Sequence, residues 1–600
     1  MGRAGRRGNS MSETNDYFIR KILRKYLVPT ILTLLGTTAA SFANNILAGR
    51  MLGREALTSM NIVSSFSFLF AMLGCLISIG GASCASVAIG RQDREKANAC
   101  ATLALVFSIV VPLLISIPLL VFFKRFFLLL GADMSLYTYC ADYAHVMLLF
   151  GFLTTLMYYP FNFLRLDGRG TLATVVFGMM AVVDILLALL FHRMGLGLLG
   201  FALAVMISTG AADLAALALL YLPSRSTIRL GKIPRGAFLP LTGDIVSRGS
   251  ASGLNNLCNM FRTMLLNAWI LTFVGKEGAS VFAVACSVLN LTTATVFGVA
   301  QTVSPLAGIF YGEKDEVSIR MLMKRAAAYA ALIHIVLFLV TFPAAGRIAG
   351  FFGMKAEPLA SRAASAVRWV TLSLIPAAVV NVFIYYYVTL RKTVLSCVLT
   401  FARAFGFTAL FIRFIIMIGK PGHLYIGFVL SELASLLLVW LLAAVERRRH
   451  PGCKGILLLE GTQSENTLSF SVQNTAEGAV RASQEMADFC RQNEVKKSLA
   501  RFLPMALEEL LVIVNEHCLQ GRGVQYIDVR ILFDEDGLLM RIRCDGKIFN
   551  PVAWYEKRSS AMTREELMMD DLLGMKMVIA KAKNVQFQNT FGVNNIIVVV

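Results

Sequence analysis

The stretch TLATVVFGMMAVVDILLALLF (171–191) contains a single charged residue, Asp184, among 21 positions. A run of this length is sufficient to cross the hydrocarbon core of a bilayer, which takes ~20 residues of helix. Inside a bilayer such a segment must be helical, because only a helix pairs all of its own backbone groups. Comparable apolar runs occupy 26–47, 101–123 and 422–445. The sequence therefore predicts an all-α membrane protein rather than a large soluble one.

The same criterion applied along the chain predicts about twelve transmembrane helices. They lie at roughly 26–48, 58–88, 99–123, 138–163, 171–192, 196–222, 246–274, 279–308, 324–345, 360–389, 394–418 and 423–446. An even number of spans returns the chain to the side of the membrane on which it started. Basic residues precede the first span and follow the last one, and such residues gather on the cytosolic side. We therefore expect a multi-pass protein of the inner membrane with both termini in the cytosol.

The composition excludes several other classes of protein. The chain is 56% hydrophobic and 16% charged, with a net charge of +20 and a mean hydropathy of +0.66. Residues 451–600 hold 17 basic and 19 acidic residues, so the first 450 hold 40 basic and 18 acidic ones. These basic residues lie in short loops between spans, which indicates a role in topology rather than nucleic-acid binding. The eleven cysteines show no CxxC and no metal-ligand spacing, so neither a metal site nor a disulfide framework is predicted.

The spans form an internal repeat. LGREALTS (52–59) corresponds to VGKEGASV (274–281), and VAIGRQD (87–93) to IFYGEKD (309–315), and both correspondences keep the same offset along the chain. Identical pairs at this offset include Asn45 with Asn267, Gly53 with Gly275, Gly90 with Gly312, Asp93 with Asp315 and Thr171 with Thr393. Two halves of six spans each have the same orientation, so we expect parallel repeats with a cavity between them.

Composition and repeats together predict six segments. They are a basic cytosolic N-terminus (1–25), a six-helix lobe (26–225), a cytosolic connection (226–245), a second six-helix lobe (246–446), a linker (447–454) and a soluble α+β domain (455–600). In the last segment we expect strands at 455–461 and 467–473, helices at 475–493 and 498–518, a hairpin around 535–537, a helix near 563–583 and a final pair of strands.

Several motifs in the first 446 residues resemble the multidrug-and-toxin-extrusion (MATE) family. NNILAGRMLGREALTS (44–59) resembles the end of the first MATE span, and GLGLLGFALAVMIS (195–208) the entry into the sixth. SPLAGIFYGEKD (304–315) is similar to the end of the eighth span, and LSEL (430–433) fits the twelfth. The resemblance implies a transporter, not an enzyme, that expels a small organic, drug-like substrate in exchange for H⁺ or Na⁺. No cofactor and no catalytic residue is expected.

The resemblance also indicates where the coupling ion binds, although the chain departs from the family pattern. The acid of the first span falls on Asn44, and the Asn-x₃-Asp pattern of the fifth span appears as Met180 and Asp184. Because intramembrane charge is costly, Asp184 is a functional candidate by default; the alternative is a purely structural pairing. Na⁺ needs several oxygen ligands, whereas a proton needs only one carboxylate, so the departures favour proton coupling.

The second lobe is rich in arginine. Arg262, Arg403 and Arg413 precede the first carboxylate at comparable depth, Glu432. Guanidinium groups bind carboxylates and phosphates in a bidentate manner, so an anionic or zwitterionic substrate remains open. Arg413 is expected to be structural. The predicted substrate cavity is lined by Asn45, Asn267, Arg262 and Arg403.

The tail resembles the ATP-binding domain of anti-sigma-factor serine kinases, which belong to the histidine-kinase-like ATPase superfamily. ALEELLVIVNEH (506–517) is similar to its first motif helix, CDGKIFNP (544–551) to its adenine loop, LLGMKMV (572–578) to its lid-side glycine segment and VQFQNTFGVNNIIVV (585–599) to its last strands. The resemblance implies an α+β sandwich of that fold.

The nucleotide chemistry of this tail is not intact. Ile513, Cys544 and Leu572 occupy the positions of the magnesium-binding asparagine, the adenine-reading aspartate and a lid glycine. The residues expected to remain from a degenerate nucleotide site are Glu509, Asn515, Asp545, Gly546 and Gly574. ATP and Mg²⁺ binding are therefore not expected, and the tail is predicted to regulate transport or to bind a cytosolic regulatory protein.

Two alternatives remain open from the sequence. One is a flippase for a lipid-linked precursor within the same superfamily, which Arg262 and Arg403 favour. The other is a membrane sensor whose tail sequesters a regulatory protein.

Overall fold

The computed structural model describes the chain apart from positions 1, 53, 126–136, 223–227, 235, 353, 355–357, 420, 460–466, 521–522, 535–536, 561–571 and 591. The chain divides into two compact units. One consists of Leu23–Leu166 and Gly170–Leu459, and the other of Met1–Ile22, Asp167–Arg169 and Glu460–Val600. The five described strands all belong to the second unit.

The first lobe is built from long helices with one broken span. Its helices are α1 (Gly2–Met51), α2 (Arg54–Gly90), α3 (Arg94–Val121), α5 (Tyr137–Leu149), α6 (Gly151–Leu156), α7 (Tyr158–Leu166), α8 (Gly170–Arg193) and α9 (Gly197–Tyr221). The helix α5 and the following helices α6 and α7 meet at a bend of 53°. The apolar stretch 171–191 lies inside α8, as its composition predicts.

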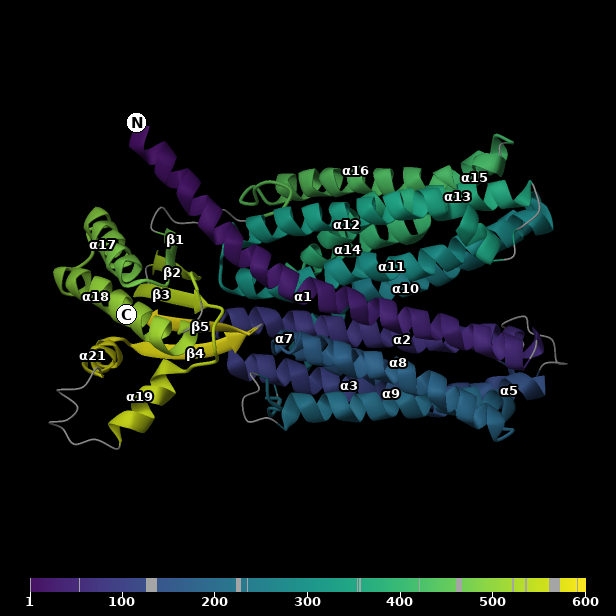
Figure 1. Ribbon diagram of the computed structural model, residues 1–600, viewed down its shortest axis with the longest axis horizontal. Helices are drawn as coiled ribbons and strands as arrows, with labels where there is room; N and C mark the ends of the chain where they lie inside the picture. Colours follow the sequence, from purple (N-terminus) through teal and green to yellow (C-terminus); the bar gives the residue numbers. More distant parts are fainter. Residues whose placement is uncertain are drawn as a thin grey trace. The chain divides into compact units, whose positions relative to one another are not determined.

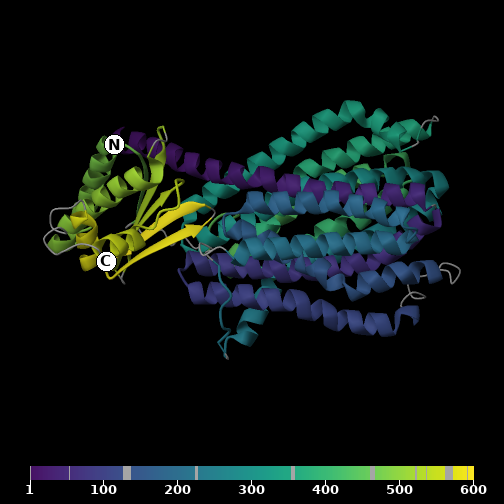
Figure 2. The same cartoon turned by 60° about the horizontal axis from the view of Figure 1, so that its bottom comes forward.

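The second lobe repeats this pattern. Its helices are α10 (Phe238–Phe273), α11 (Gly275–Gly312), α12 (Glu316–Phe351), α13 (Leu359–Thr389), α14 (Thr393–Phe401), the π-helix η2 (Ala402–Gly406), α15 (Phe407–Met417), the short 3-10 helix η3 (Pro421–His423) and α16 (Ile426–Arg449). The long helices of both lobes run alongside one another in two views (Figures 1 and 2).

The number of membrane-spanning helices is lower than the sequence predicts. Within the described residues, ten helices are long and apolar enough to cross a membrane, or up to eleven if the bent pair α5–α7 counts as one span. The helix α10, expected as the seventh span, is not among them. Its middle carries Arg262 and four asparagines, and these polar side chains lower its hydropathy. The chain is therefore a multi-pass helical membrane protein with about ten recognisable spans.

The repeated motifs form equivalent turns. Asp93 and Asp315 are the N-caps of α3 and α12, and each side chain accepts a backbone N–H three residues later, at 2.9 and 3.0 Å. The preceding residues, Gln92 and Lys314, both have positive φ, 64° and 54°. Two turns at equivalent positions of the repeat therefore share their backbone conformation and their cap.

The two lobes meet closely where α2 crosses α10. A Cβ atom added to Gly80 would lie 2.1 Å from the carbonyl oxygen of Ile245. One added to Gly249 would lie 1.8 Å from the carbonyl oxygen of Leu76. Only glycine permits this approach, as in other membrane helices that pack through small residues. The crossing joins the lobes backbone to backbone.

The C-terminal tail contains a five-stranded antiparallel sheet. Its strands are β1 (Thr467–Gln473), β2 (Tyr526–Asp534), β3 (Gly537–Cys544), β4 (Asn584–Thr590) and β5 (Val593–Val599), in the order β1-β2-β3-β5-β4. Its helices are α17 (Ala476–Gln492), α18 (Lys497–Val514), the π-helix η4 (Asn515–Leu519), α19 (Pro551–Ser559) and α21 (Leu573–Lys581). This arrangement agrees with the predicted α+β domain.

The core of the tail lies between the helices and one face of the sheet. Val529 and Ile531 of β2 are fully buried with Leu507 and Leu510 of α18 in one hydrophobic cluster. Strand residues that alternate with these include Asp528, whose carboxylate pairs with Arg543. The alternation of apolar and charged residues along β2 and β3 therefore assigns one face of each strand to the core.

Two predictions about the tail were wrong or incomplete. Residues 455–458 form turns, with an isolated bridge between Lys454 and Leu459, where a strand was expected. The helix α19 was not predicted; Pro551 begins it, and the side chain of Asn550 caps it by accepting from Val552 N and Ala553 N. Of the helix expected near 563–583, Leu573–Lys581 is helical and positions 563–571 lie outside the described residues.

Candidate functional site

The structure brings the two predicted coupling residues together inside the first lobe. Asn44 of α1 donates from Nδ2 to Oδ2 of Asp184 on α8, at 2.5 Å. The two residues are 5% and 7% exposed. Oδ1 of Asp184 and Oδ1 of Asn44 are buried and form no hydrogen bond with any described residue. The pair therefore offers two free oxygens at a buried position.

Hydroxyl groups hold α1 and α8 together about three turns from this pair. The Thr33 hydroxyl donates to the Thr174 hydroxyl at 2.8 Å, and the Thr174 hydroxyl donates to the Pro29 carbonyl at 2.9 Å. Pro29 lies inside α1, where proline cannot donate a backbone hydrogen bond and weakens the helix. These contacts fix the approach of α1 to α8, and so they position Asn44 opposite Asp184.

The pair itself provides few oxygen ligands for a metal cation. Asn44 and Asp184 supply few oxygens, and Met180, one helical turn before Asp184, has only a weakly coordinating thioether. A carboxylate that is buried away from other charges can bind a proton without further ligands.

The predicted cavity residues are not all brought together. Asn267 on α10 is exposed, and the side chain of Asn45 lies outside the described residues. Arg413 stacks on Trp269 and Phe273, with its guanidinium carbon 5.6 and 4.6 Å from the two ring centroids. The aromatic contacts of Arg413 give it a packing role, as expected.

Arg403 forms an ion pair within the second lobe. Its Nε donates to Oε2 of Glu432 on α16 at 2.9 Å, and both side chains are 10% exposed. Arg403 lies in η2, and such π-helical segments reorient side chains relative to a regular helix. The Glu432 carboxylate therefore compensates the charge of Arg403. The sequence singled out Arg403 for the cavity without recognising this partner.

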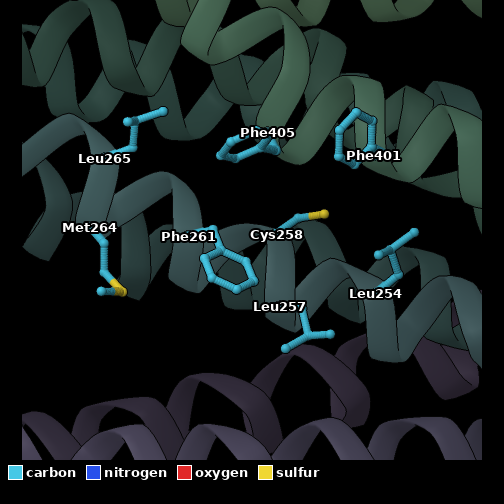
Figure 3. Close-up of a pocket in the computed structure, with 8 residues that line it drawn as sticks. All are labelled: Leu254, Leu257, Cys258, Phe261, Met264, Leu265, Phe401 and Phe405. Carbon is cyan, nitrogen blue, oxygen red and sulfur yellow. The ribbon is translucent and has the colours of Figure 1, made fainter. Parts of the chain in front are cut away.

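Arg262 lies beside an apolar pocket of the second lobe. The pocket has a volume of about 510 Å³ and is lined by Leu254, Leu257, Cys258, Phe261, Met264, Leu265, Phe401 and Phe405 (Figure 3). Arg262 is four residues after Cys258 and three before Leu265, so it lies on the same face of α10 as these two lining residues. The structure gives Arg262 no ion pair or hydrogen bond among its described residues. Its charge interacts with the Glu432 carboxylate, which pairs directly with Arg403. A cation without a direct ion pair among the described residues therefore borders this pocket.

One buried acid of the first lobe, Asp213, is not among the residues predicted for the site. It lies in α9 and is 1% exposed, and neither carboxylate oxygen has a hydrogen-bond partner among the described residues. The argument that selected Asp184, an acid inside an apolar span, applies equally to Asp213. The signal is present in the sequence, but the family resemblance points to the fifth span and not to the sixth.

Some residues of the predicted nucleotide site do lie together in the tail. A Cβ atom added to Gly574 of α21 would lie 2.0 Å from Cδ of Glu509 on α18. A Cβ atom added to Gly546 would lie 2.3 Å from the carbonyl oxygen of Cys518. Asn515 is half-buried in η4. Asp545 forms an ion pair with Lys21, at 3.1 Å.

The three substituted positions of this site belong to the core. Ile513 and Cys544 lie in the hydrophobic cluster of the tail, and Leu572 is fully buried. A hydrogen bond with Cys518 and burial together raise the pKa of the Cys544 thiol well above its usual value. Cys544 therefore stays neutral at neutral pH and provides no carboxylate for an adenine amine.

Comparison with known proteins gives the family. A family model described as MatE matches residues 29–190 and 251–412. Both ends of the second segment are displaced from those of the first by the same offset that separates the repeated motifs. No match was found among curated protein sequences.

Solved structures share the fold of this chain at low identity. One is an outward-facing conformation of a multidrug resistance MATE family transporter of the MOP superfamily, 21% identical, with a TM-score of 0.66, covering 72% of this chain and 97% of that chain. A mutant of the Vibrio cholerae MATE transporter VcmN is 18% identical, with a TM-score of 0.67 and coverages of 74% and 99%. A MOP superfamily transporter from Pyrococcus furiosus Vc1 is 20% identical, with a TM-score of 0.66 and coverages of 72% and 97%.

The two segments matched by the family model make up more than half of the chain. They include the helices that carry Asn44, Asp184, Arg262 and Arg403. This protein therefore belongs to the MatE family of multi-pass membrane transporters.

Proposed function

We propose that the protein is a secondary-active exporter that exchanges a small organic substrate for protons across the inner membrane, with both termini in the cytosol. The family membership favours this function over a lipid-linked precursor flippase or a membrane sensor. The observation that carries the proposal is the buried pair of Asn44 and Asp184, which joins two helices of the first lobe through a hydrogen bond of 2.5 Å.

The pair couples ion binding to helix position. When Asp184 is ionised, its carboxylate accepts the Asn44 amide hydrogen bond, which is stronger for a charged acceptor than for a neutral one. Protonation of Asp184 weakens this hydrogen bond and removes a charge from the apolar interior. The attachment of α1 to α8 therefore depends on whether a proton is bound, and transport exploits that difference.

Replacement of Asp184 tests the proposal directly. We expect Asp184→Asn to lower transport driven by a pH gradient at least tenfold in proteoliposomes, because asparagine keeps the shape but cannot bind a proton. Glu95→Gln is the matched control, since it also neutralises a carboxylate of the first lobe but at an exposed position of α3. Normal gradient-driven transport by Asp184→Asn would contradict the proposal. A Na⁺ gradient in parallel vesicles distinguishes the two ions.

The second lobe supports a substrate with an apolar body and a negative group. The pocket beside Arg262 is lined by apolar side chains, and guanidinium groups bind carboxylates or phosphates. Arg262 and Arg403 together bring two positive charges to one carboxylate, Glu432. The similar structure from Pyrococcus furiosus is described as having a binding pocket of reverse polarity that suggests a different function. We expect Arg262→Ala to weaken binding of an amphipathic organic anion more than that of an organic cation of similar size. Arg262→Lys, which retains the charge, is the control, and equal effects on both ligands would exclude an anion site.

The tail is proposed to regulate transport and to bind a cytosolic protein. The segment that leads to it is anchored on the second lobe, because the Tyr386 hydroxyl donates to Leu457 O and the Tyr387 hydroxyl to Ile456 O, each at 2.8 Å. A partner that binds the tail and displaces this segment would therefore disturb its hydrogen bonds with α13. Truncation after Arg449 should leave basal transport measurable, whereas complete loss of transport by folded truncated protein would contradict a purely regulatory tail.

A further inference from the structure

The helix α9 carries one acid in an otherwise apolar span. Asp213 is 1% exposed, and both of its carboxylate oxygens are buried without a hydrogen-bond partner among the described residues. The hydroxyl of Thr209, one turn away on the same helix, donates instead to the Val205 carbonyl at 2.7 Å. Asp213 is therefore isolated even from the nearest polar side chain on its own helix.

The helices packed against α9 supply no partner either. The main neighbours of α9 are α5, α6, α7 and α8. Their buried or half-buried titratable side chains, as far as the structure describes them, are Tyr137 and Tyr143 on α5, Tyr158, Tyr159 and Arg165 on α7, and Asp184 and His192 on α8. Tyr159 pairs with Tyr221, Arg165 with Gln301 and the face of Phe161, and Asp184 with Asn44. Of these side chains, none forms a described hydrogen bond or ion pair with Asp213.

Such a carboxyl group must be neutral in this conformation. At pH 7 an ordinary aspartate is protonated in about one molecule in 10³. Burying an unpartnered, charged carboxylate costs more free energy than protonating the carboxyl group at pH 7, which this ratio measures. Asp213 therefore holds a proton here, and it can lose the proton only when water or a basic partner reaches it. An apolar side chain such as leucine would fill the same place without leaving polar atoms unsatisfied. An acid at this position therefore indicates a function that depends on its carboxyl group.

Asp213 lies at a different depth from Asp184. In a helix that rises about 1.5 Å per residue, Asp184 is about 21 Å from the start of α8 at Gly170. By the same rise, Asp213 is about 12 Å from the end of α9 at Tyr221. These two helix ends lie on the side that the loop charges predict to be cytosolic, so Asp213 is the nearer of the two acids to that side.

We propose that Asp213 is a second proton-binding site of the first lobe, separate from the Asn44–Asp184 pair, which exchanges its proton with the cytosolic side. Its role in transport rests on the proposed function, in which the proton released at Asp213 completes the passage of a proton that enters at Asp184. The presence of a bound proton at Asp213 does not depend on transport and is tested separately.

Dicyclohexylcarbodiimide identifies carboxyl groups that are protonated in apolar surroundings. The carboxyl proton moves to a carbodiimide nitrogen, the carboxyl oxygen adds to the central carbon, and an acyl shift to nitrogen yields a stable N-acylurea. We expect the full-length protein in lipid vesicles at pH 7.5 to form this adduct on the Asp213 peptide at least tenfold more than on the peptide of exposed Glu95, by mass spectrometry. Absence of an adduct on Asp213 would overturn the proposal.

The variant Asp213→Asn separates a proton site from a permanently neutral packing group. Asparagine matches the neutral acid in shape, so the variant should fold and insert normally, with the melting temperature of the unsubstituted protein. We expect transport driven by a pH gradient to fall at least tenfold. A wild-type dependence on pH in this variant would overturn the proposal, even if the adduct forms. If the unsubstituted protein transports nothing under any gradient, the proposed function is wrong. The carbodiimide adduct then still shows whether Asp213 binds a proton, because it does not depend on transport.

Discussion

The crossing of α2 and α10 allows a quantitative test of how the two lobes meet. In Gly249→Ala the new Cβ would lie 1.8 Å from the Leu76 carbonyl oxygen, whereas non-bonded carbon and oxygen atoms require about 3.3 Å. The obstacle is backbone, so no side chain can turn away, and the helices must separate by about 1.5 Å, the difference between these distances. Overpacking of this kind costs about 1–3 kcal/mol. If the lobes exchange between a state in which α2 and α10 touch and a state in which they are apart, this cost favours the separated state by about 5- to 150-fold.

Spin labels on Arg91 and Lys314 provide the assay, because both residues are exposed. Arg91 directly follows Gly90 at the end of α2, and Lys314 lies two residues after Gly312 at the end of α11. A Cβ added to Gly90 would lie 3.0 Å from Cα of Gly312, so the labelled turns start close together. Pulsed electron resonance should show longer distances in Gly249→Ala than in the unsubstituted protein.

Gly243→Ala is the control for this experiment. It lies on the same helix, but an added Cβ would meet nothing within 4 Å, and alanine is the better helix former by about 1 kcal/mol. We expect Gly243→Ala to leave the distances unchanged. Identical distance distributions and melting temperatures for the two variants would refute the close backbone crossing.

Three further predictions concern the second lobe and the tail. Glu432→Gln leaves Arg403 buried and unpaired, so the melting temperature should fall by an amount equivalent to about 3–5 kcal/mol, and the double variant with Arg403→Gln should recover much of the loss. Replacing Tyr386 and Tyr387 together by Phe removes two hydrogen bonds of about 1 kcal/mol each and should increase proteolysis between residues 450 and 460, without loss of the membrane helices. ATP with Mg²⁺ should leave the melting temperature of the full-length protein unchanged, and a clear rise in that temperature would restore a nucleotide site to the tail.

Much of the architecture follows from local properties of the sequence. Hydropathy predicted the spans, because a lipid-exposed helix must be apolar around most of its surface. The exception, α10, shows the limit of this reasoning: a helix that packs on α2 within the protein can carry Arg262 and several asparagines. In the tail, apolar periodicity predicted β2, β3 and α18. Residues 455–458 form turns beside Tyr386 and Tyr387, although their apolar composition favours a strand.

The sequence by itself determined the helical membrane class, the repeat at a constant offset along the chain, the α+β tail and the candidacy of Asp184, since each depends on composition or on spacing along the chain. Tertiary structure alone decided which charges have partners. Arg403 lies next to Glu432 and Asn44 next to Asp184, while Asp213 lies among helices that offer it no hydrogen bond within the described residues. The free energy of a buried charge depends on the atoms within a few ångströms, and those atoms come from segments that are 29 to 140 residues apart in the chain.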